Sequence, residues 1–133
     1  MSYDGPWEAI ESVLVKLNID PRMRLDELDQ DPEYTACRCE ELEQYLNLYR
    51  SGSLSADERA VIACFMLEGL NEFASSDRVH PLEQAIFETL VKAGDHALEL
   101  AYWMDTSGTD ETHWWPITKR LLFLQQKVSG VET

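Results

Sequence analysis

Paired carboxylates one helical turn apart are the side chains of this chain whose spacing best suits chemistry. Glu68 and Glu72 are four positions apart in an apolar segment, so a helix would carry them on one face. Helical-bundle nucleotide pyrophosphohydrolases and di-metal proteins hold hard divalent cations between such pairs on facing helices. One pair is half of such a site. Glu68 and Glu72 are therefore metal ligands only in an alternative hypothesis, a metal-dependent nucleotide hydrolase, and the main prediction has no metal and no cofactor.

The histidines give weaker signals for catalysis. His96 and Glu99 read His-x-x-Glu, the reverse of the Glu-x-x-His motif of ferritin-like iron sites, and the motif has no second copy. His80 directly precedes a proline that suits a helix start, and His113 falls in a predicted loop. None of the three has a nucleophile beside it in sequence. We therefore predict no catalytic residue, and the sequence favours a protein that is not an enzyme.

Acidic residues are concentrated in one stretch, which we call the acidic tract, from Asp26 to Glu43. The tract nets −7 against a chain total of −14, because Arg38 is its single cation. Its eight carboxylates are Asp26, Glu27, Asp29, Asp31, Glu33, Glu40, Glu41 and Glu43. Such a field repels nucleic acid and anionic membranes and steers cations over a Debye length, about 8 Å at physiological salt. We expect a basic protein partner, with no direct binding of nucleic acid or membrane.

The predicted partner-binding residues combine charges with one aromatic anchor. Trp103 is placed by helical periodicity on a polar face, and an indole surrounded by charge is typical of a binding hot spot. Its alternative role is structural, under a loop from Thr106 to His113 that folds back over it. The alternative for the charges is a solvated face that maintains solubility. The predicted binding set is Asp26, Glu27, Asp29, Glu33, Glu40, Glu43 and Trp103.

Helix start signals indicate how these residues are positioned. Every proline stands where a helix could begin, and Ser55 to Glu58 forms a capping box. No alternating strand pattern competes. The predicted helices span about 6–18, 21–29, 32–50, 56–75, 81–105 and 114–128. The predicted fold is all-α, a single domain over residues 1–133, built as a bundle of five main helices plus one short helix with the fourth helix central.

Helical periodicity at 100° per residue assigns a face to each side chain. In the third predicted helix, Glu33, Glu40 and Glu43 oppose an apolar stripe into which Arg38 projects. The fourth helix is apolar nearly all round. The long fifth helix turns Ala97, Leu98, Ala101 and Tyr102 inward and leaves His96, Glu99 and Trp103 on its polar side. The last helix exposes Lys119, Arg120 and Lys127.

Composition and targeting signals bound the class of protein. A hydrophobic content of 44% is ordinary for a globular domain. The start of the chain lacks the features of a secretory signal, and no stretch approaches the roughly 20 apolar residues of a membrane span. An odd number of cysteines favours reduced thiols, so we expect a cytoplasmic location.

The function hypothesis that follows is a small acidic cytosolic binding or inhibitor protein. Bacterial immunity proteins, antitoxins and phage-encoded inhibitors share this composition, which is an analogy and carries no family assignment. The expected partner is a basic toxin, nuclease or nucleic-acid-handling protein. A further alternative is a homo-oligomeric adaptor, in which Lys119, Arg120 and Lys127 of one copy meet the acidic tract of another. The chain is therefore expected to be a monomer or a small homo-oligomer.

Overall fold

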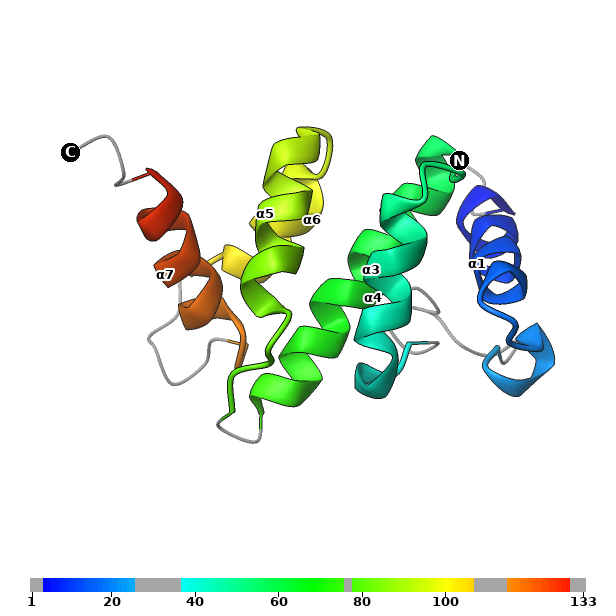
Figure 1. The fold of residues 1–133 in the computed structure, drawn as a ribbon, viewed down its shortest axis with the longest axis horizontal. Helices are drawn as coiled ribbons and strands as arrows, with labels where there is room; N and C mark the ends of the chain where they lie inside the picture. The colour runs from blue at the N-terminus through cyan, green and yellow to red at the C-terminus, as the bar shows by residue number, and fades with distance from the viewer. Residues whose placement is uncertain (1–3, 26–36, 76–77, 107–114, 130–133) are drawn as a thin grey trace. The chain divides into compact units, whose positions relative to one another are not determined.

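The computed structural model describes residues 4–25, 37–75, 78–106 and 115–129. Within these ranges every regular element is helical and no strand occurs, which confirms the predicted all-α class (Figure 1). The α-helices are α1 (Asp4–Lys16), α3 (Leu42–Arg50), α4 (Ala56–Ala74), α5 (Glu83–Ala93), α6 (Ala97–Met104) and α7 (Thr118–Ser129), and the 3-10 turns are η1 (Pro21–Met23) and η2 (Cys39–Glu41). None of these helices is long and apolar enough to cross a membrane.

The chain divides into two compact units, and the boundary falls inside α4. The first unit is Met1–Gly69 and the second unit is Leu70–Thr133. Each is described by itself below. The single-domain organisation stays a prediction, whereas the short second helix is confirmed in reduced form, as η1.

In the first unit, α1, α3 and α4 bury one another's apolar faces. Tyr45 of α3 and Phe65 of α4 are both fully buried, with ring centroids 5.4 Å apart. Gly69 permits the close approach of these two helices, because a Cβ atom there would stand 2.8 Å from Cδ2 of Leu42. The buried core of this unit also includes Ile10, Val13, Leu14 and Leu46.

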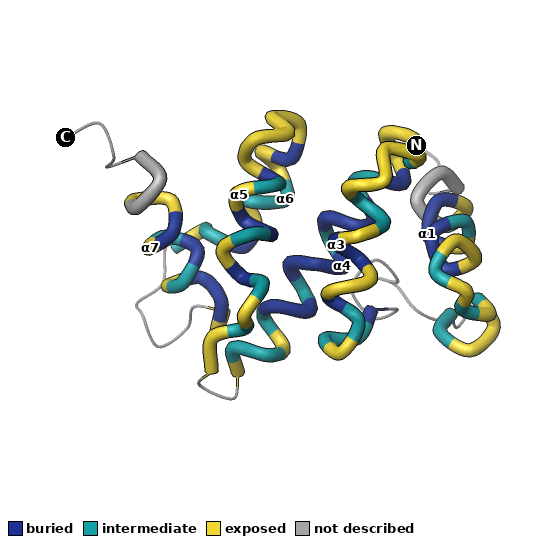
Figure 2. Tube along the Cα trace, in the orientation of Figure 1, coloured by how far each residue is buried: buried dark blue, intermediate teal, exposed yellow. Residues whose placement is uncertain are grey.

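The helix α4 is buried on nearly all sides, as its sequence predicts. Buried residues fill the consecutive positions 61–63 and 65–67, which together cover more than a full turn (Figure 2). A helix that is apolar all round needs neighbours on every side. The burial of α4 agrees with the central role predicted for the fourth helix.

Glu58 fastens α1 to the start of α4. The predicted capping box is confirmed, since the Glu58 amide donates to Ser55 Oγ at 3.2 Å and the Ser55 amide donates to Glu58 Oε1 at 2.8 Å. The same carboxylate accepts hydrogen bonds from Ser12 Oγ and, at 2.9 Å, from Lys16 Nζ. The Ser12 hydroxyl, the Ser55 amide and Lys16 lower the pKa of Glu58 to about 2. One side chain thus serves as a cap and as a contact between helices.

In the second unit, α5 and α7 are joined by an ion pair and by packed aliphatic residues. Arg120 donates from Nε and Nη2 to the buried carboxylate of Glu83, at 3.1 and 2.9 Å to Oε1. Asn71 Oδ1 accepts a hydrogen bond from the Ile117 amide at 3.1 Å, which satisfies a donor just ahead of α7. The buried aliphatic and aromatic residues of α5 and α7 include Ile86, Phe87, Leu90, Leu121 and Leu124, and Ile117 just ahead of α7 is buried as well.

The long fifth helix of the prediction is wrong, because it is broken at Gly94. Gly94 has φ of +80°, the left-handed conformation that ends helices at glycine, and α6 begins afresh at Ala97. Periodicity counted through the break carries the wrong phase into α6. Leu98, predicted to be inside, is 84% exposed, while His96, predicted on the polar face, is 2% exposed.

The start of the third predicted helix also differs. Residues 31–36 lie outside the described ranges, and Arg38 is extended, with φ −139° and ψ 137°. Arg38 therefore does not project into the α3 stripe as predicted. Its amide instead donates to the Tyr45 hydroxyl at 2.8 Å, and within the described residues the α-helix of this segment begins at Leu42.

Candidate functional site

Two members of the predicted acidic binding set lie in the described part of the chain. Glu40 in η2 and Glu43 in the first turn of α3 are both exposed, as predicted. Their orientation follows from the neighbours Leu42, Tyr45 and Leu46, which are buried and direct the opposite side of α3 to solvent. The other predicted carboxylates, Asp26, Glu27, Asp29 and Glu33, lie outside the described residues.

Glu41, between the two exposed carboxylates, has a structural contact. Arg24 donates to it from both Nη1, at 3.0 Å, and Nη2, and the Tyr45 hydroxyl donates to it at 2.6 Å. Burial raises the pKa of Glu41, but hydrogen bonds from Arg24 and Tyr45 outweigh that effect and lower it overall. Burial also raises the pKa of the Tyr45 phenol, helped by its bond to Glu41. Sequence reasoning missed this cluster because Arg24 is seventeen positions away.

Trp103 does not have the exposure that its predicted anchor role requires. Its side chain is 2% exposed, and its carbonyl accepts a hydrogen bond from Thr118 Oγ1 at 2.6 Å. The indole packs edge-on against Tyr102 at 5.1 Å and Trp115 at 5.2 Å between centroids. The expectation of an exposed Trp103 is wrong, because the break at Gly94 rotates α6. Of the covering loop that was its alternative, residues 107–113 lie outside the described ranges.

Exposed aromatic surface in the second unit belongs to neighbours of Trp103. Tyr102 is 46% exposed and Trp115 is 44% exposed, and their ring centroids are 6.0 Å apart. Large half-exposed rings of this kind are favoured at binding surfaces. The sequence contained the correct residue types, but it did not show which of them face solvent.

The alternative metal ligands are not brought into a cluster by the described residues. Glu68 is half-buried and Glu72 is exposed on α4. Across residues 4–25, 37–75, 78–106 and 115–129, no three His, Cys, Asp or Glu side chains are arranged to hold a metal ion.

The histidines have structural surroundings. His96 is enclosed between two carboxylates, with Nε2 3.3 Å from Asp95 Oδ1 and Nδ1 3.6 Å from Glu99 Oε1. His80 accepts a hydrogen bond on Nδ1 from the Leu82 amide at 3.0 Å, and burial lowers its pKa. His80 therefore caps the approach to α5, in agreement with its predicted position before a helix. His113 lies outside the described residues.

The predicted basic face of the last helix is partly neutralised inside the second unit. Arg120 is held by Glu83 and also stacks on Phe123, with Cζ 5.3 Å from the ring centroid. Lys119 is exposed, and the side chain of Lys127 is not among those described. The charge available for the predicted contact with a second copy is smaller than the sequence suggests.

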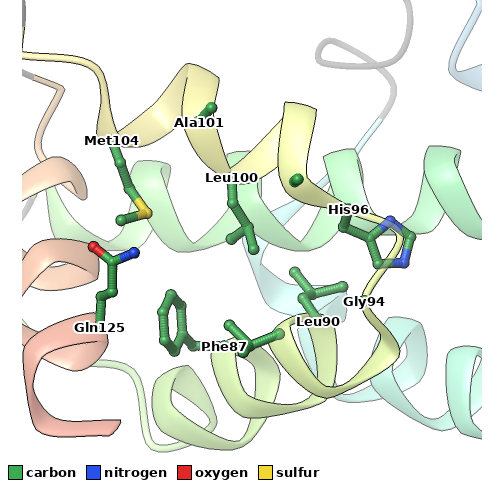
Figure 3. Close-up of a pocket in the computed structure, with 10 residues that line it drawn as sticks. Phe87, Leu90, Gly94, His96, Leu100, Ala101, Met104 and Gln125 are labelled. Atoms are coloured by element: carbon green, nitrogen blue, oxygen red, sulfur yellow. The ribbon is translucent and has the colours of Figure 1, made fainter. Parts of the chain in front are cut away.

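A groove is formed by α5, α6 and α7 within the second unit. Its volume is about 500 Å³. Leu100 and Met104 extend from α6 toward Phe87 and Leu90 of α5, while His96 and Gln125 lie at opposite ends (Figure 3). Apolar walls with a few polar groups at the ends are typical of sites that bind another molecule. The sequence did not predict this groove, because the predicted helix over 81–105 is continuous and leaves no separate α5 and α6 to enclose it.

Comparison of the chain with protein-family models, with curated proteins and with solved structures gives no match.

Proposed function

We propose that this chain is a binding protein that neutralises or regulates a basic protein partner through an acidic helical surface. The proposal rests on a difference between three neighbouring carboxylates at the start of α3. Glu40 and Glu43 are exposed, whereas Glu41 between them is held by Arg24. This contrast supports a role for the two exposed carboxylates in contact with a partner.

The net charge of the first unit adds to this argument. Its residues include fifteen Asp and Glu against six Lys and Arg. Four of these carboxylates, Asp26, Glu27, Asp29 and Glu33, lie outside the described residues but belong to the acidic tract with Glu40 and Glu43. A surface of this sign raises the association rate of a positively charged protein and orients it, while repelling polyanions. The partner class we propose is a toxin, nuclease or other nucleic-acid-handling protein whose own basic cleft is built for phosphate.

Capture of the partner from the native cell, followed by association kinetics, tests the proposal. We expect Glu43→Lys to slow association severalfold at low salt and to flatten its salt dependence, because steering acts before contact. Combining Glu40→Lys with it should slow association further. The matched control is Glu88→Lys on α5, an exposed carboxylate in the second unit whose reversal changes the net charge equally.

The kinetic outcomes distinguish docking on the acidic surface from an effect of the net charge of the chain. Equal slowing by Glu43→Lys and Glu88→Lys would assign the effect to net charge and would remove the acidic surface as a docking site. An association rate that neither substitution changes at low salt contradicts the proposal altogether.

A further inference from the structure

We propose that the α5–α6–α7 groove binds the apolar side of a basic amphipathic helix of the partner. This inference rests on the proposed function for the positive charge of the partner. It adds the apolar anchor that Trp103, being buried, does not provide.

The walls of the groove suit a helix more than a compact ligand. Ala97 and Ala101 are exposed at its edge one turn apart, and residues this small let another backbone approach α6 closely. Beneath them, Leu100 and Met104 meet Phe87 across the groove (Figure 3). The lining is therefore apolar along the length of α6, whose eight residues extend about 12 Å.

That length matches the anchors of a bound helix. Side chains at positions i, i+3 or i+4, and i+7 of an amphipathic helix span roughly 10 Å along its axis. A volume of about 500 Å³ lies in the range of preformed binding sites. Two or three aliphatic side chains from one helical face would fill the groove and cover the parts of Val91, Leu100 and Met104 that now face solvent.

The charges beside the groove select a basic occupant. Asp95 and Glu99 stand at the His96 end, and Asp105 follows Met104 at the other end. From Gly94 to Asp105 the sequence has these three carboxylates and no Lys or Arg. A second copy of the chain is disfavoured as occupant, because each copy carries −14 and the two would repel.

Binding of labelled model peptides to the full chain tests the inference. The probes are three 18-residue peptides with Lys and Arg on one helical face and Leu, Ile or Phe on the other. We expect at least one to bind with micromolar affinity, and Ala101→Gln to weaken it at least tenfold by placing a longer polar side chain in the groove. Leu98→Gln is the control, since Leu98 is 84% exposed on α6 and does not line the groove. It should change the affinity less than twofold.

A scrambled peptide and one acidic substitution separate this inference from the proposed function. Scrambling keeps the charge and removes the apolar face, so equal binding of both peptides would overturn the groove and leave the acidic surface standing. Binding reduced by Ala101→Gln but indifferent to Glu43→Lys supports the groove and counts against the acidic surface. Failure of all three peptides to bind at millimolar concentration overturns the groove, as does concentration-dependent self-association that Ala101→Gln abolishes.

Discussion

The two units of the chain stabilise their helices by different interactions. In the first unit, Glu58 and Glu41 each accept hydrogen bonds from a cation and a hydroxyl, and these contacts link segments far apart in sequence. In the second unit, the described contacts include the ion pair between Glu83 and Arg120 and an aromatic cluster around Trp103. Among the described residues, the large exposed apolar side chains are Val15 and Met23 in the first unit, and Val79, Val91, Leu98, Tyr102, Trp115 and Phe123 in the second.

For the proposed function, the two units are suited to different steps of binding. Charges steer a partner over several ångströms but contribute little affinity where the contact remains solvated. Apolar contacts act at short range and supply most of the affinity. The acidic first unit is suited to the first task. The groove and exposed aromatic rings of the second unit are suited to the second.

Replacing Trp103 should produce the largest change in stability. We expect Trp103→Ala to lower the free energy of unfolding by about 3–5 kcal/mol, because a fully buried indole leaves a cavity. Its neighbour Tyr102, 46% exposed, is the control, and Tyr102→Ala should cost about 1 kcal/mol or less. Urea denaturation followed by circular dichroism measures both. If the two substitutions lowered the free energy of unfolding equally, Trp103 would be exposed, as predicted from sequence.

Removing the cation of the ion pair in the second unit should have the next largest effect. Arg120→Met leaves the Glu83 carboxylate, which is 3% exposed, without its counter-charge, and we expect a cost of about 2 kcal/mol. Adding Glu83→Gln in the same chain should recover part of that loss. The first unit supplies a matched control in Arg22→Met, because the Arg22 and Asp20 pair is exposed and its loss should leave the free energy of unfolding nearly unchanged.

Recovery in the double variant decides the interpretation. If Glu83→Gln added to the damage instead, the ion pair would not be the source of the loss, and stacking of the Arg120 guanidinium on Phe123 would account for it.

The Glu58 contacts predict an acid sensitivity that belongs to the first unit. Its pKa of about 2 lies below the usual 4.5, so its stabilising contribution is complete above about pH 4.5 and is lost as the pH falls toward 2. We expect Glu58→Gln to cost about 1–2 kcal/mol at pH 7 and progressively less below pH 4. Glu43→Gln, at an exposed position, should leave stability nearly unchanged at both pH values. A cost for Glu58→Gln that is the same at pH 7 and pH 2.5 would contradict this assignment.

The smallest effect is expected at Leu98. A residue in the core, as predicted for a continuous fifth helix, would lose about 2–5 kcal/mol on replacement by a polar side chain. Because Leu98 is 84% exposed, Leu98→Gln should change the free energy of unfolding by no more than about 0.5 kcal/mol. A large loss at this position would mean that α5 and α6 are continuous after all.

Local signals in the sequence were sufficient for the class of fold and for most helix positions. Proline starts and the Ser55 to Glu58 capping box act within one turn, so they survive any tertiary arrangement. The apolar α4 and the outward Glu43 follow from counting faces inside one helix, whereas Glu40 is exposed in η2, ahead of α3. The helix break at Gly94 was the main failure, since glycine inside a periodic segment does not by itself state whether the helix continues.

The sequence by itself therefore determined an all-helical chain with a concentrated acidic tract, because helix propensity, capping and net charge are properties of neighbours along the chain. Tertiary structure alone decided which charges are available to a partner and which are held inside. Arg24 reaches Glu41 and Arg120 reaches Glu83 across distances in sequence that no periodicity encodes. It also decided that Trp103 is buried and that a groove opens beside α6, because the rotation of α6 after Gly94 depends on packing against α7 and α5 rather than on its own residues.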